Sequence, residues 1–228
     1  MSNKNKKFNK MRRKILTILC LSLIASSCDN LKKEKIVAIS TPVAIKKIAI
    51  KSIHILPLGN VSKQVVEDVL SGLVSFYHIE ISIEKAVPLE YSLLAKSKER
   101  YSADSILKKF KNNNVTLVLT EKDIVSKKDA DPITKKPAVE EWGVFGLGNL
   151  HGKTTVISLF RLRRNATPQL LKERLQKVCI HEIGHNLGLN HCTKNSKCLM
   201  SAANGTIKQV DQEEMFFCEN CRKLAGIY

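Results

Sequence analysis

The sequence has few aromatic residues, no long hydrophobic run and no acidic residue in its first 27 positions. Phe, Trp and Tyr together make up 5% of the 228 residues, with a single Trp. The basic residues are scattered in pairs without aromatic residues between them, and this pattern does not favour nucleic-acid binding, in which stacking side chains accompany positive charge. The longest apolar run covers residues 15–25. A helix needs roughly 20 apolar residues to cross a bilayer, so this run is too short for a permanent span.

The positive charge is concentrated at the start of the chain. The formal net charge is +17, and the first 27 residues contribute seven basic residues: Lys4, Lys6, Lys7, Lys10, Arg12, Arg13 and Lys14. Without these seven charges the remainder carries +10. A basic domain can attract acidic peptides, anionic membranes or nucleic acid, and the scattered arrangement favours an ordinary solvated surface. The length suits one domain with a tail.

Residues 1–27 resemble a bacterial lipoprotein signal peptide. A basic start precedes the apolar run 15–25, and Ala25, Ser26 and Ser27 then precede Cys28. In such a signal the chain is cleaved before the cysteine, so we expect Cys28 to be lipid-modified; Ala25 stands where leucine is usual. An ordinary cleaved signal peptide and an uncleaved anchor are the alternatives. All three predict export to the cell envelope, with residues 28–46 as a tether and 47–228 as one catalytic domain.

Hydrophobic periodicity predicts alternating strands and helices in the domain. Strands are expected over residues 48–56, 79–84 and 115–120, the last of them central, with a turn at 57–60. Ser62 and Ser102 are expected to cap helices, the first running to about Tyr77. Residues 121–137 are polar and predict a surface loop. Either 144–147 or 154–160 could form an unpaired edge strand able to bind an extended peptide.

A third helix is predicted to carry the chemistry. Thr167 and Pro168 form a helix start, and the apolar spacing continues to Leu187. Within it His181-Glu182-x-x-His185 places two imidazoles on one face, where they can share a zinc ion. Its apolar neighbours are expected to raise the pKa of Glu182.

The residues after His185 complete a zinc site of the catalytic kind. Gly188 can turn the chain at the helix end, which brings His191 back toward the other two ligands. Three protein ligands leave the fourth position open for a water molecule, with Glu182 beside it as the expected general base.

Four of the seven cysteines form a second metal-ligand pattern. Cys20 lies in the signal, and Cys179 is expected to be a small buried residue on the helix. The remaining four are Cys192, Cys198, Cys218 and Cys221. Two nearby pairs, one of them C-x-x-C, favour zinc. Two disulfides are the competing interpretation, because exported proteins favour them.

The full pattern is similar to that of the archaemetzincins, a family of metzincin zinc peptidases. The similarity rests on H-E-x-x-H-x-x-G-x-x-H-C, Met200 and Cys218-x-x-Cys221, and weaker features extend it from about Ile48 to the end. Five residues separate Cys192 from Cys198, where the family pattern has four. The resemblance implies an α+β metzincin-like fold, with a mixed twisted sheet, a backing helix, an active-site helix and a small C-terminal zinc-bound subdomain. It also implies a single zinc for all four cysteines and makes Met200 the Met-turn beneath the catalytic zinc.

The expected function is therefore hydrolysis of peptide bonds by a zinc-activated water, with two zinc ions per chain. Peptides or proteins are the expected substrates, the protein is expected to be a monomer, and its membrane contact is the lipid anchor. Some metzincins place a tyrosine two residues after the Met; Ala202 is found here, so no phenolic helper is expected. The main alternative is a zinc-stabilised envelope binding protein with weak or no turnover, and the presence of Glu182 argues against it. An export signal likewise argues against a zinc-ribbon nucleic-acid binder.

Overall fold

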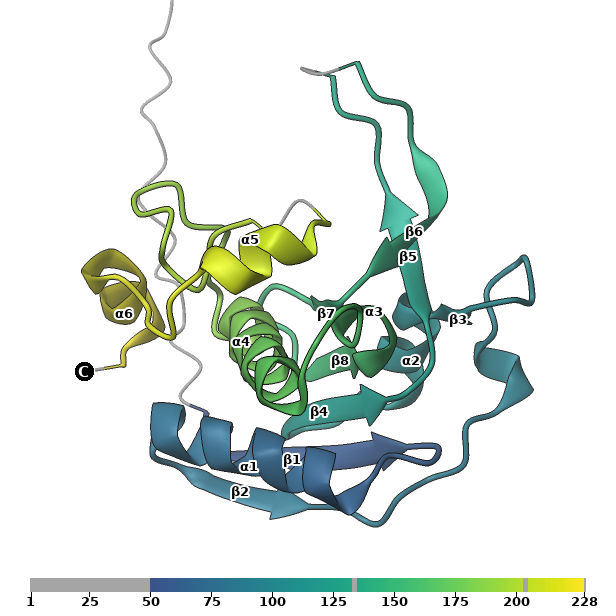
Figure 1. The fold of residues 1–228 in the computed structure, drawn as a ribbon, viewed down its shortest axis with the longest axis horizontal. Helices are drawn as coiled ribbons and strands as arrows, with labels where there is room; N and C mark the ends of the chain where they lie inside the picture. The colour runs from purple at the N-terminus through teal and green to yellow at the C-terminus, as the bar shows by residue number, and fades with distance from the viewer. Residues whose placement is uncertain (1–49, 133–134, 203–204, 228) are drawn as a thin grey trace, which may run out of the picture. The chain divides into compact units, whose positions relative to one another are not determined.

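The computed structural model describes residues 50–132, 135–202 and 205–227. The expected signal peptide (1–27), the tether (28–46) and Cys28 lie outside these residues. The described chain forms an α+β fold around a five-stranded sheet with the order β2-β1-β4-β8-β7 (Figure 1). The strands are β1 (Ser52–Leu58), β2 (Glu80–Ile83), β4 (Val115–Thr120), β7 (Gly146–Gly148) and β8 (Thr154–Ser158). Four are parallel, and β7 runs antiparallel to β8, so the sheet is mixed as expected.

Helices cover both faces of this sheet. The helices α1 (Lys63–Tyr77) and α4 (Pro168–Asn186) pack against one face, and α2 (Ala103–Lys109) packs against the other (Figure 1). Strand β4 is buried at every position, with Leu117 and Leu119 in the core beneath α1 and α4 and Val118 in the core beneath α2. A strand covered on both faces has no polar side, which is why its sequence is a continuous apolar, β-branched run.

The predicted helix starts are confirmed. Ser62, Ser102 and Thr167 each accept a hydrogen bond from the backbone N–H three residues later, at 3.3, 3.1 and 3.2 Å. Each hydroxyl satisfies a donor that the first helical turn leaves unpaired. The predicted turn at 57–60 begins later than expected, because β1 continues through Pro57 to Leu58 and the left-handed residue is Gly59, with φ of 79°.

The prediction of a loop over residues 121–137 was wrong in part. Strand β5 (Ile124–Lys128) pairs in antiparallel fashion with β6 (Val139–Val144), and β3 (Tyr101–Ser102) completes a second, three-stranded sheet. Only Ile124 and Val125 of β5 are buried. The rest of the hairpin projects beyond the core (Figure 1), so its sequence lacks an apolar face that periodicity could detect.

The strand order shows which of the two candidate segments, 144–147 or 154–160, lies at the edge of the sheet. Residues 154–158 form β8, which lies between β4 and β7 and therefore has partners on both sides. Strand β7, which overlaps the other candidate segment 144–147, is last in the order and pairs with β8 alone among the described strands. It lies directly beside α4, the helix that carries the His-Glu motif.

Four shorter helical segments complete the fold: η1 (Tyr91–Leu93), α3 (Leu159–Leu162), α5 (Ile207–Gln212) and α6 (Glu219–Ala225). The C-terminal segment shares the main core, with Cys198, Met200, Val210 and Phe217 all buried in the cluster that includes α1 and α4. A bidentate ion pair between buried Arg174 and exposed Asp211 fixes α5 against α4, because Arg174 donates to both carboxylate oxygens at 2.6 and 2.8 Å. The C-terminal segment thus shares one core with the sheet and the helices α1 and α4.

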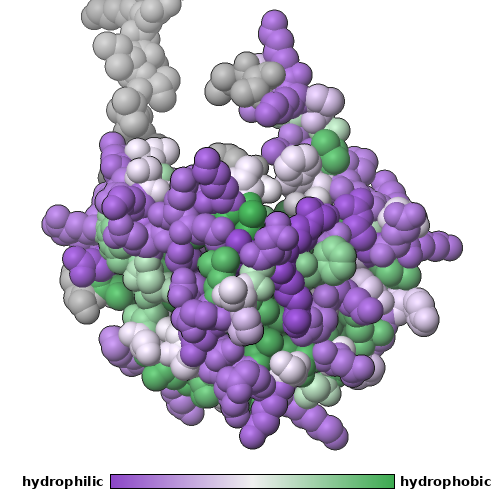
Figure 2. Space-filling model, viewed as in Figure 1, coloured by the Kyte–Doolittle hydropathy of each residue, from purple (hydrophilic) through white to green (hydrophobic). Residues whose placement is uncertain are grey.

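Hydrophilic residues cover most of the face in Figure 2, and hydrophobic residues emerge there only in separated patches. Among the residues that the structure describes, none of the helices has the length and apolar character needed to cross a bilayer.

Candidate active site

Three histidines converge beside the end of α4. His181 and His185 lie one turn apart on this helix, which ends at Asn186. Gly188 then adopts a φ of 88°, a left-handed conformation that glycine reaches without steric cost, and the chain turns back to His191. The ring centroids lie 4.9, 5.3 and 5.0 Å apart, and one nitrogen from each ring lies within 4.8 Å of the others. The three rings therefore surround one point, at which they could hold one metal ion.

Backbone carbonyls fix the orientation of two of these rings. The Nδ1 atom of His181 donates to the carbonyl oxygen of Leu199 at 2.6 Å, and Nδ1 of His185 donates to that of Leu189 at 2.7 Å. Donation by Nδ1 selects the tautomer in which the other nitrogen, Nε2, carries a free lone pair for a metal. Burial lowers the pKa of all three histidines, that of His181 to about 3, so the rings are neutral and able to act as ligands.

Glu182 lies between the histidines and the edge strand. Its Oε2 accepts a hydrogen bond from the backbone N–H of Gly148 in β7, at 2.8 Å. Burial raises the pKa of Glu182 to about 8, as its apolar surroundings predict, although the Gly148 hydrogen bond acts in the opposite direction. One carboxylate oxygen is thereby anchored, and the other can exchange a proton near the histidines.

Met200 is fully buried beneath α4. Its sulfur lies against Gly184, where a Cβ atom would approach Sδ to 2.4 Å, so a side chain at this helix position would displace the methionine. Leu199, which orients His181, immediately precedes Met200, and the Met200 carbonyl accepts from the Cys192 N–H at 2.7 Å. This short segment links the histidine set to the cysteines.

The four cysteines form a second cluster. Their sulfur atoms all lie within 4.8 Å of one another, with 3.7 Å between Cys192 and Cys218 and 3.8 Å between Cys198 and Cys221. A disulfide requires about 2.05 Å, and all four are free thiols. Tetrahedral zinc with Zn–S bonds of about 2.3 Å requires sulfur atoms about 3.8 Å apart. The spacing therefore fits zinc and does not fit the competing pair of disulfides.

The additional residue between Cys192 and Cys198 is absorbed by a turn. Asn195 organises it: its carbonyl accepts from the Cys198 N–H at 3.1 Å and from the Ser201 hydroxyl at 3.0 Å. Its side chain accepts from the Lys197 N–H at 2.9 Å. The longer loop thus still delivers Cys198 to the cluster.

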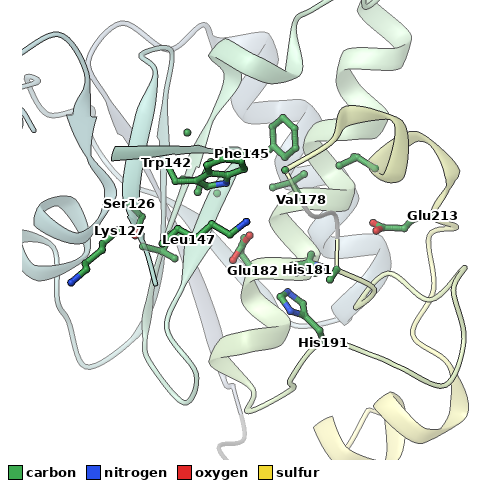
Figure 3. Close-up of a pocket in the computed structure, with 17 residues that line it drawn as sticks. Ser126, Lys127, Trp142, Phe145, Leu147, Val178, His181, Glu182, His191 and Glu213 are labelled. Atoms are coloured by element: carbon green, nitrogen blue, oxygen red, sulfur yellow. The ribbon is translucent and has the colours of Figure 1, made fainter. Parts of the chain in front are cut away.

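A cavity of about 350 Å³ opens beside the histidines (Figure 3). Phe145 and Leu147 lie on its β7 side, and Trp142 of the β5–β6 hairpin overhangs it. Ala202 lines the wall after the Met-turn, so no phenol is supplied from that position. Neither Glu213, which also lines the cavity, nor the Gly148 N–H was predicted from sequence, because neither belongs to a local motif.

The fold and the site together define a class: a zinc-dependent metallopeptidase of the metzincin kind, in which an edge strand borders a helix carrying two histidines and a glutamate. Comparison with known proteins narrows this class. The profile of peptidase family M54 matches residues 24–225. The archaemetzincin of Archaeoglobus fulgidus is 33% identical over 169 residues, which cover 74% of this chain and 95% of that protein. The archaemetzincin of Haloarcula marismortui is 28% identical over 182 residues, covering 75% and 97%.

Solved structures of archaemetzincins have a similar fold. The crystal structure of the Archaeoglobus fulgidus archaemetzincin, determined in complex with malonate, matches with a TM-score of 0.63 at 30% identity, covering 76% of this chain and 99% of that one. The fold is also similar to that of the Methanopyrus kandleri archaemetzincin, with a TM-score of 0.60 at 24% identity and coverage of 77% and 93%. The chain belongs to peptidase family M54, the archaemetzincins. It is a zinc metallopeptidase, and its substrates are peptides or proteins.

Proposed function

We propose that His181, His185 and His191 hold the catalytic zinc and that Glu182 is the general base. The observation that carries this proposal is the orientation of the rings, since carbonyl acceptors hold the Nδ1 atoms of His181 and His185 and leave Nε2 for the metal. When bound there, zinc supplies Lewis acidity toward water and toward the scissile carbonyl. Glu182 accepts the proton of the attacking water on the oxygen that Gly148 leaves free, and then donates it to the leaving amine.

Strand β7 is the surface on which the substrate backbone lies. Its outer edge has no partner strand in the described part of the chain, so an extended peptide can add to it by backbone hydrogen bonds. The same strand anchors Glu182 through Gly148, and this contact keeps the base in register with the bond to be cleaved. Met200 supports the histidines from beneath by packing against Gly184.

The cysteine cluster holds a second, structural zinc, giving two zinc ions per chain. The sulfur spacing of 3.7 and 3.8 Å supports this assignment. Four protein ligands complete a tetrahedron and leave no position for water, so this ion stabilises the segment that carries Met200 and takes no part in hydrolysis.

The test combines zinc content with turnover. Purified protein should contain two zinc ions per chain and cleave a mixed peptide library. The Glu182→Ala variant should keep both ions and lose activity by about 10²- to 10⁴-fold, the usual contribution of a positioned base. Equal cleavage by both proteins would contradict the role of Glu182, and a zinc content of one would contradict the second site.

The same proposal includes export and anchoring, with the mature chain beginning at a lipid-modified Cys28 and acting as a monomer in the cell envelope. The small residues before Cys28 support the lipid signal. Mass analysis of the mature N-terminus should find an acylated cysteine, and light scattering of the delipidated domain should give the monomer mass. An unmodified N-terminus at another residue would refute the anchor.

A further inference from the structure

We infer that Glu213 makes the active-site cavity selective for a substrate residue with a long basic side chain, arginine or lysine, next to the cleaved bond. This inference rests on the proposed function, because it concerns the pocket of the same catalytic site.

Glu213 is a buried carboxylate that faces this cavity. It follows α5 as the C-terminal cap and is only 5% exposed. It lines the same cavity as His181, Glu182 and His191, and Figure 3 shows its carboxylate directed toward Val178 and His181. Val210, three residues earlier, lines the cavity beside it, so the buried side of α5 and its cap presents one apolar and one acidic side chain.

The Glu213 carboxylate makes only weak interactions with the described residues of the protein. The Gln209 side-chain amide donates to it at 3.5 Å, the upper limit for a hydrogen bond. Lys177 on α4 is the basic group that acts on it electrostatically, but the Lys177 ammonium donates to the carbonyls of Val210 and Asp211 at 3.1 and 3.4 Å. Among the described residues no basic side chain forms an ion pair with Glu213. A buried carboxylate in this setting gains more from a cation than a solvated one, because its own hydration has already been lost.

The walls of the cavity suit the stem of a basic side chain. Val178 lies three residues before His181 on α4, and therefore on the same face of the helix one turn deeper. Val178 and Val210 both belong to the cavity lining and make part of its wall apolar. Arginine and lysine carry methylene stems that pack on such surface while the charged end reaches a carboxylate. The whole cavity, at about 350 Å³, is larger than either side chain.

The experiment compares arginine with citrulline, its neutral analogue of nearly the same shape. The substrates are Ala-Ala-Arg-Ala-Ala and Ala-Ala-citrulline-Ala-Ala. Because all other residues are alanine, each peptide can bind in the register that places its central side chain in the pocket. The zinc-loaded protein should cleave the arginine peptide with a kcat/KM at least about tenfold higher, with the cut next to arginine. A ratio near one in the unmodified protein would overturn the inference, and this comparison needs no variant.

Two variants localise the effect. Glu213→Gln keeps the size of the side chain and removes its charge, and should lower the arginine-to-citrulline ratio to within about threefold of one. The matched control is Glu214→Gln, since Glu214 is exposed and pairs with Lys197 on the surface; it should leave the ratio unchanged. An unchanged ratio in Glu213→Gln, or an equal fall in both variants, would overturn the inference.

A binding measurement separates this inference from the proposed function. Zinc-loaded Glu182→Ala should bind the arginine peptide at least about tenfold more tightly than the citrulline peptide, and adding Glu213→Gln should abolish the difference. If the wild type cleaves neither peptide nor a mixed library, the proposed function fails, while this ratio still decides the role of Glu213. Equal affinities in Glu182→Ala would overturn that role even in an active enzyme.

Discussion

At the scale of single residues, the site depends on close contact between α4 and the Met-turn. Gly184 lies one residue before His185, a proposed zinc ligand, and the fully buried Met200 fills the space that a side chain at position 184 would need. The contact also involves Phe217, whose Cζ would lie 3.2 Å from an added Cβ. The carbonyl that accepts the His181 hydrogen bond and the side chain that packs against Gly184 thus belong to the same short segment, Leu199 and Met200. Substitutions that disturb this contact should therefore lower both the stability of the fold and its affinity for the metal.

Gly184→Ala tests this contact. The added methyl group should force Met200 and Phe217 to move, at a cost of about 1–3 kcal/mol in the free energy of unfolding, the usual range for overpacking a core. Zinc affinity should fall as well, because the histidines above the contact shift. Chemical denaturation and zinc titration measure the two effects. Ser75→Ala in α1 is the control: Ser75 is exposed and the substitution adds no atom to the core, so little change is expected. Equal stability of both variants would contradict the packing role of Met200.

Glu213 also gives the folded state a pH dependence. Burial raises its pKa from about 4.5 to about 7. A carboxyl group with a raised folded-state pKa binds its proton more tightly in the folded state, so its contribution to stability is fully present below about 4.5 and is lost as the pH rises through about 7. Wild-type zinc-loaded protein should therefore lose Tm relative to Glu213→Gln between pH 5 and pH 8, a window chosen to bracket the folded pKa. Differential scanning fluorimetry of both proteins, with Glu214→Gln as control, measures this. A constant difference in Tm across the range would show that Glu213 does not titrate in this window.

At the scale of elements, backbone hydrogen bonds connect the segment that leads into α6 with the histidines proposed to hold the catalytic zinc. Cys221 lies in α6 and Cys218 caps its start, while Cys198 belongs to the segment that continues into Leu199 and Met200. The Leu199 N–H donates to the Phe216 carbonyl at 2.9 Å, so the two cysteine-bearing segments also pair directly. A metal bound by all four cysteines would hold the Leu199 carbonyl in place against His181.

Cys221→Ser should therefore reduce activity although Cys221 lies outside the catalytic cavity. We expect zinc content to fall from two to one per chain and kcat/KM to fall by about 10- to 100-fold, the range seen when a group that orients a metal ligand is disturbed. Zinc analysis and peptide hydrolysis measure these changes. Lys223→Ala is the matched control on the same helix, because Lys223 is exposed and pairs with Glu219 across one turn. Full activity with one zinc would show that the two sites are independent.

At the scale of the whole molecule, the parts that sequence alone predicts are those encoded by local spacing. The eleven-residue motif from His181 to His191 lies within a single helix and turn, so covalent geometry alone brings its ligands together. The caps at Ser62, Ser102 and Thr167 are equally local. The Gly148 N–H and the Glu213 carboxylate reach the site only through tertiary packing, since they lie 34 positions before and 31 positions after Glu182 in the chain. Strand β5 was missed for a related reason. Its polar sequence does not indicate a strand, and it becomes one by pairing with β6.

The two proposed metal sites differ in a way that predicts two separate stages of metal loss. The histidine set is open, with three protein ligands and an exposed His191, whereas the cluster has four thiol ligands, among them Cys198 and Cys221 at 0% and 3% exposure. A chelator such as 1,10-phenanthroline should remove one zinc and abolish hydrolysis while far-UV circular dichroism stays near its starting value. The second zinc should leave only after a mercurial reagent reacts with the thiols, because four-thiolate sites bind zinc tightly and form part of the fold. Hydrogen exchange should then show that the backbone amides of residues 192–201, Leu199 among them, and of residues 216–225 lose protection. Release of both ions together with that loss of protection, on chelation alone, would contradict the division into an open catalytic site and a closed structural one.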